Sequence, residues 1–179
     1  MTEIGSIYGG ALYDLAAGEN LSEEILKQLQ VLSHSFEEEP NFVNLLSAHS
    51  LSKEERCRIV DGSFADKVHP YVLNFLKLLT EKGYSRYFLD CANAFKVQYN
   101  VDNNILPVTA VSAVKLTEKQ AARLTAKLEE QTGKTVIITN RIDPEVLGGV
   151  RLDFDNKCVD DTLAHRLDSV RHLLNNTIL

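Results

Sequence analysis

The stretch Pro144–Leu174, PEVLGGVRLDFDNKCVDDTLAHRLDSVRHLL, decides the fold of the end of the chain. Apolar and polar residues alternate over residues 150–154, which is the period of a strand with one buried face. Asp155 and Asn156 suit a turn, so residues 157–159 are expected to return as a second strand. The stretch therefore opens with a predicted β-hairpin.

An amphipathic helix is predicted after this hairpin. The side-chain oxygens of residues 160–162 can accept hydrogen bonds from the free amides of a helix start. Apolar residues then recur at spacings of four, three and four, which places them on one helical face. They are Leu163, Leu167, Val170 and Leu174.

Charge is unevenly distributed along the 179 residues. Residues 1–104 carry nine Lys and Arg against fifteen Asp and Glu, whereas residues 105–179 carry ten of each. Nucleic acid is not expected as a partner, because phosphate binding requires a basic footprint. We also expect no direct membrane insertion, since no run of about 18 uncharged apolar residues occurs.

The sequence offers no candidate catalytic or metal-binding group. Cys57, Cys91 and Cys158 are far apart and form no Cys-x-x-Cys pair. The acids of residues 153–161 do not fit a calcium loop, and His165 and His172 are too far apart for a helical metal site. We therefore expect no catalytic residue, no metal and no cofactor.

Residues 1–104 are predicted to form a six-helix antiparallel bundle, because six helical segments alternate with short loops. Start and stop signals mark these segments. They are Gly18 as a stop, Asn20 with Glu23 as a capping box, Pro40 as a start, Ser52 with Glu55 as a second capping box, Pro70 as a start and Gly83 as a stop.

Gly9 and Gly10 lie inside the first predicted helix, where each costs about 1 kcal/mol relative to Ala. One explanation is the close approach of another helix, which a missing side chain permits. The alternative is simple tolerance within a packed bundle. The sequence leaves both explanations open.

A small α/β domain is predicted over residues 105–179, with its helices on one face of a sheet and a C-terminal helix. Residues 105–114 are rich in β-branched side chains, with Pro107 at an edge or first strand position. Thr117 and Gln120 form a capping box for the following helix, which Gly133 ends. A strand over residues 136–138 follows.

Asp143–Leu174 resembles the C-terminal signature of the delta subunit family of F-type ATP synthases, which includes the mitochondrial oligomycin-sensitivity-conferring protein. The matching features are Gly148 and Gly149, Asp155, Asp160 and a last helix rich in Arg and Leu. YGGALYDLA near the start and LTEKG at residues 79–83 support the resemblance. The chain departs from the family at Asp161 and Thr162, where Gly-Ser is usual, at His165, and at Gly9, where Ala is usual.

The resemblance implies a non-catalytic stator subunit that links the catalytic head to the b subunits, at the cytoplasmic face of a bacterial cell membrane. It implies that residues 1–104 bind the N-terminal helix of an alpha subunit in a groove between the first and fifth helices. It also implies that residues 105–179 bind the C-terminal end of the b-subunit dimer. The residues expected at the first site are Tyr8, Ala11, Leu12, Leu15, Asn74, Lys77 and Leu78; those at the second are Arg166, Leu173 and Leu174.

Two other hypotheses stay open at this point. The chain could be a small-molecule enzyme that uses its α/β domain and a helical lid, although no converging polar groups are evident. It could also be a helical adaptor unrelated to ATP synthase. A helix-in-groove partner would require an exposed apolar surface, which distinguishes the stator hypothesis.

Overall fold

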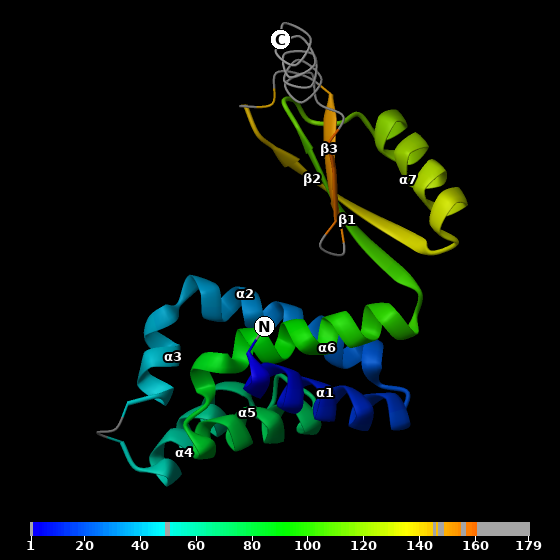
Figure 1. Ribbon diagram of the computed structural model, residues 1–179. Helices are drawn as coiled ribbons and strands as arrows, with labels where there is room; N and C mark the ends of the chain where they lie inside the picture. The colour runs from blue at the N-terminus through cyan, green and yellow to red at the C-terminus, as the bar shows by residue number, and fades with distance from the viewer. Residues whose placement is uncertain (1, 49–50, 145, 147–148, 155–156, 161–179) are drawn as a thin grey trace, which may run out of the picture. The chain divides into compact units, whose positions relative to one another are not determined.

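The computed structural model describes residues 2–48, 51–144, 146, 149–154 and 157–160 (Figure 1). The chain divides into two compact units, Met1–Tyr99 and Asn100–Leu179. The first unit is helical, and the second contains a mixed sheet with a helix. This architecture agrees with the predicted α plus α/β class. The sequence-based boundary after residue 104 lies just beyond helix α6, whereas the first unit ends inside that helix.

Six α-helices and one short 3-10 helix form the described part of the first unit. In chain order they are α1 (Glu3–Gly18), α2 (Ser22–Glu38), α3 (Pro40–Leu46), α4 (Lys53–Phe64), α5 (Pro70–Lys82), η1 (Ser85–Tyr87) and α6 (Phe88–Asp102).

Most of these helices begin and end at residues whose capping hydrogen bonds or backbone conformation favour a helix end. Ser52 and Glu55 make both hydrogen bonds of the predicted capping box at α4. The Ser52 amide and hydroxyl hold the pKa of the Glu55 carboxyl below its usual range. Pro70 is the first residue of α5, and Gly83 ends that helix with a left-handed φ of 75°. The helix boundaries predicted from these four residues are confirmed.

The junction between α1 and α2 differs from the prediction. Asn20, expected to cap α2, instead adopts a left-handed φ of 59° and ends α1. The Leu21 amide donates to the Ala16 carbonyl at 2.9 Å and the Asn20 amide donates to the Ala17 carbonyl at 3.2 Å, which is a Schellman motif. α1 does end at Gly18, as predicted, but the left-handed residue of the cap is Asn20, so the Asn20 capping box predicted for α2 is wrong.

One apolar core joins the helices of the first unit. Phe36 of α2 contacts Phe88 of α6 with ring centroids 4.7 Å apart, and Tyr13 of α1 meets Phe95 edge-on at 5.3 Å. Leu29, Val60, Val72 and Leu79 are also buried there. Burial of a side chain of this size stabilises the fold by about 1.5–3 kcal/mol.

Glycines set the distance between α1 and α6. A Cβ atom at Gly9 would overlap the Cys91 carbonyl oxygen and lie 2.8 Å from the Ala94 Cβ, and one at Gly5 would lie 2.8 Å from the Asp90 Cβ. Gly10 has no such neighbour within 4 Å. Close helix approach therefore explains Gly9, whereas Gly10 is merely tolerated. The sequence analysis missed Gly5, which lies one turn before Gly9.

The second unit contains a four-stranded sheet in the order β2-β1-β3-β4. The strands are β1 (Ile105–Ser112), β2 (Thr135–Ile142), β3 (Val150–Phe154) and β4 (Lys157–Asp160), and helix α7 (Glu118–Thr132) connects β1 to β2. β1 and β2 are parallel, and the β3–β4 hairpin is antiparallel, as predicted. Leu128 of α7 packs on Leu106, Val108 and Val136, so α7 covers one face of the sheet.

Local signals place α7 correctly, but β1 does not lie at an edge. Thr117 and Gln120 form the predicted capping box, and Gly133 ends α7 with a φ of 66°. β1 lies between β2 and β3, which makes it central. Pro107 is tolerated there because pairing with β3 begins only at Thr109. The predicted C-terminal helix over residues 163–174 lies outside the described residues.

The helix contact predicts opposite effects for two adjacent glycines. Gly9→Ala forces a methyl group into the backbone of α6 and is expected to lower the free energy of unfolding by about 1–3 kcal/mol. Gly10→Ala adds helix propensity in open space and is expected to be neutral or to stabilise by up to about 1 kcal/mol. Urea unfolding of the full chain measures both values. Equal effects of the two substitutions would contradict the close contact.

Candidate partner-binding surfaces

The face of α1 that points away from the core carries an apolar stripe. Ile7 is 60% exposed and Leu15 47% exposed, and Ala11 between them is also exposed. These three residues are four apart, so they follow one line along the helix. Because Gly5 and Gly9 fit against α6, the stripe is left on the solvent side. Ile7 was not among the predicted contact residues, although its spacing from Ala11 would have identified it.

Two other predicted residues of α1 lie deeper. Tyr8 is half-buried, and its ring meets the ring of Tyr84 edge-on at 5.8 Å. Tyr84 follows the end of α5 closely, so this contact brings the middle of α1 near the end of α5. Leu12 is 5% exposed and belongs to the core. Leu12 therefore packs beneath the exposed residues of α1 and has little exposed area that a partner could contact.

The predicted residues of α5 form a second exposed line. Asn74 and Leu78 are one turn apart, and both are exposed, Leu78 to 40%. Lys77 is half-buried, and its ammonium lies 2.5 Å from the Asp61 carboxylate of α4. This ion pair fixes α5 to α4 and leaves Leu78 as the apolar side chain presented to solvent. We call Ile7, Tyr8, Ala11 and Leu15 of α1, together with Asn74 and Leu78 of α5, the α1–α5 surface.

The residues predicted to bind the second partner cannot be placed in this way. Arg166, Leu173 and Leu174 lie outside the described residues. The preceding hairpin of β3 and β4 is described, and it leads to this segment. The second predicted site therefore remains a prediction from the sequence.

The described thiols are poor nucleophiles. Burial raises the pKa of Cys91 to about 11, with a smaller contribution from the adjacent Asp90. Burial, followed by the Glu81 carboxylate, also raises the pKa of Cys57. Since the thiolate is the reactive form of cysteine, both side chains are held in the unreactive form at neutral pH.

The two thiols should differ in their reactivity toward an alkylating reagent. With iodoacetamide at pH 8, we expect the half-buried Cys57 of the native chain to react and Cys91 to stay unmodified until the chain unfolds. Peptide mapping by mass spectrometry assigns each site separately. Cys91 should react readily in urea because unfolding removes the burial that raises its pKa. Rapid labelling of Cys91 in the native chain would contradict its placement against α1.

Other functional groups give little indication of chemistry. Within the residues that the structure describes, no three His, Cys, Asp or Glu side chains gather in a way that could hold a metal ion. None of the described helices has the length and apolar character needed to cross a membrane. The exposed side chains of the α1–α5 surface are suited to hold a partner helix.

The fold defines a class of two-unit proteins in which a helical unit is followed by a small α/β unit. The family model for the ATP synthase delta (OSCP) subunit matches residues 4–174, and the chain belongs to that family. Members are non-catalytic peripheral-stalk subunits of F-type ATP synthases.

Curated relatives match along nearly the whole chain. ATP synthase subunit delta of Clostridioides difficile is 31% identical over 176 residues, covering 98% of this chain and 97% of the relative. ATP synthase subunit delta of Lactobacillus johnsonii is 32% identical over 173 residues, covering 96% and 94%. A chain in the cryo-EM structure of the Toxoplasma gondii mitochondrial ATP synthase hexamer has the same fold, with a TM-score of 0.77, 17% identity and coverage of 97% and 98%.

Proposed function

We propose that the chain joins the catalytic head of an F-type ATP synthase to the b subunits by binding one partner with each unit. The α1–α5 surface receives the N-terminal helix of an alpha subunit. The observation that supports this most directly is the exposed stripe of Ile7, Ala11 and Leu15 on α1, with Leu78 exposed on α5. Binding of an amphipathic helix would be stabilised by about 25 cal/mol for each Å² of apolar surface that the contact buries.

The second unit supplies the other attachment. In this proposal the C-terminal end of the b-subunit dimer binds residues 105–179, with Arg166, Leu173 and Leu174 in the contact. Helices α1 to α6 act as one antiparallel six-helix bundle over residues 1–104. Two attachments allow the chain to resist rotation of the head, so that proton-driven rotation is coupled to ATP synthesis at the cytoplasmic face of a bacterial cell membrane.

Neither of the other two hypotheses has a comparable observation in its favour. An enzyme that uses the α/β domain is inconsistent with membership of a family of non-catalytic subunits. A helical adaptor unrelated to ATP synthase is inconsistent with membership of the delta family.

Charge substitutions on the α1–α5 surface test the first attachment. Leu15→Glu combined with Leu78→Glu is expected to weaken binding of a peptide from the N-terminal helix of the alpha protein to the full chain at least about tenfold, because each change buries a carboxylate against apolar surface. Isothermal titration calorimetry measures the affinity. Val31→Glu is the matched control, since Val31 is 68% exposed on α2, away from this surface. Equal losses in the control and the double variant would contradict the proposed site.

A separate substitution tests the second attachment. Leu173→Glu with Leu174→Glu is expected to weaken binding of a peptide from the C-terminal end of the b protein to the full chain by about tenfold or more. Binding of the peptide from the alpha protein should stay unchanged, and an unaltered thermal unfolding profile checks that the second unit remains folded. Unchanged affinity for the b peptide would remove this segment from the proposed contact.

A further inference from the structure

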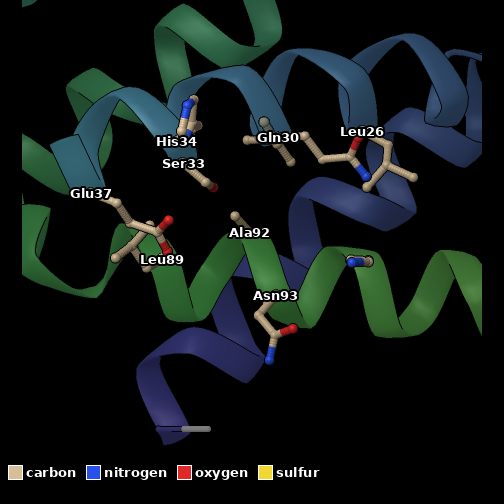
Figure 2. Close-up of a pocket in the computed structure, with 10 residues that line it drawn as sticks. Leu26, Gln30, Ser33, His34, Glu37, Leu89, Ala92 and Asn93 are labelled. Atoms are coloured by element: carbon tan, nitrogen blue, oxygen red, sulfur yellow. The ribbon is translucent and has the colours of Figure 1, made fainter. Parts of the chain in front are cut away.

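A groove lies on the first unit, and none of the residues that line it belongs to the α1–α5 surface. Helices α2 and α6 form the walls of a groove with a volume of about 360 Å³ (Figure 2). Ser33 of α2 and Ala92 of α6 face the groove from opposite walls, and both side chains are small. Because neither reaches across, the helices leave a channel between them.

The floor of this α2–α6 groove is apolar. Leu26, Leu29 and Ala92 line it and are each less than a tenth exposed. Leu89 lines one end and is 38% exposed. From Leu26 to Glu37 the α2 wall spans about 16 Å at 1.5 Å per residue, which is about three helical turns. Gln30, His34 and Asn93 also line the groove, so a channel of this length matches a helix whose narrow apolar stripe is flanked by polar side chains.

The two ends of the groove carry opposite charge. Glu37 lies beside Leu89 at one end (Figure 2), and α6 runs from Leu89 toward the Leu26 end. Lys96 lies two turns beyond Leu89 on the same face of α6, so its ammonium lies at the other end of the groove. Among the described ion pairs, none uses Glu37 or Lys96. An occupying helix is stabilised when its N-terminal end meets the carboxylate and its C-terminal end meets the ammonium.

We infer that the α2–α6 groove binds an amphipathic helix of about three turns in one direction, with its N-terminal end at Glu37 and its C-terminal end at Lys96. This site is separate from the α1–α5 surface and does not depend on the contact proposed there. The first unit then receives two helices on two surfaces. A lipid headgroup or nucleic acid is a poorer occupant, because residues 1–104 carry an excess of acidic groups.

A designed peptide probes the direction of binding. The peptide has about 14 residues, with Leu and Ala along one face, Lys in its first turn, Glu in its last turn and a nitroxide spin label at its N-terminus. It is titrated into the full ¹⁵N-labelled chain. The amide signals of Glu37 and Leu89 should broaden more strongly than those near Lys96. Stronger broadening at the Lys96 end, or broadening at Ile7 and Leu78 alone, would overturn the inference.

Substitutions establish whether the groove itself holds the peptide. Ser33→Trp places a ring over the floor and should reduce affinity more than about tenfold. Lys96→Glu should reduce it about two- to fivefold, because it reverses the charge that meets the helix C-terminus. Lys67→Glu is the matched control, since this exposed lysine lies outside the groove and should leave the affinity unchanged. Equal affinity for all three variants, each with unaltered thermal unfolding, would contradict the site.

Discussion

The close contact between α1 and α6 determines what the first unit can present to a partner. At Gly5 and Gly9 the two helices approach so closely that a side chain on α1 would meet the atoms of Asp90, Cys91 or Ala94. The Thr2 hydroxyl extends this contact by donating to the Asp90 carboxylate at 2.6 Å. With one face of α1 held in this way, the rotation of the helix about its axis is fixed. The apolar residues on its other face must then point to solvent.

This arrangement explains why a stable helical unit carries exposed apolar side chains. Hydrophobic residues on a surface are usually scattered, whereas on α1 they follow one line, and α5 exposes a further leucine, Leu78. The core does not depend on them, because the aromatic contacts of Phe36, Phe88 and Phe95 lie on the inner faces. The outer faces are therefore available for binding without loss of the fold. This separation suits a protein that must stay folded while force passes through it.

Local chemistry could be predicted from the sequence, whereas contacts between distant segments could not. The capping box of Ser52 and Glu55 and the left-handed Gly83 act within a few residues, so their patterns predict the helix boundaries correctly. The prediction for Asn20 is wrong because its role depends on hydrogen bonds that the chain makes backward to the last turn of α1. Pro107 lies near the start of β1 and before the pairing with β3, as the sequence allowed, but the central place of β1 could not be predicted because strand order is set by pairing across the sheet.

The same limit applies to the candidate site. Helical spacing places Ala11 and Leu15 on one line of α1, but it cannot tell that they are exposed whereas Leu12 faces the core. Spacing gives the face of a helix, and only the neighbouring helices decide whether that face is covered. Gly5 and Gly9 decide it for α1. The groove between α2 and α6 could not be predicted from the sequence, because small side chains on two distant segments create it.

The central claim is that the chain transmits force between two bound ends. Proton-driven ATP synthesis tests it most directly, in membrane vesicles whose synthase lacks this protein and is then supplied with the wild-type chain or the variant carrying Leu15→Glu and Leu78→Glu. The account predicts that the wild-type chain restores synthesis and that the variant does not, while ATP hydrolysis by the catalytic head continues in both. Full synthesis with the variant, or without any added chain, would contradict it.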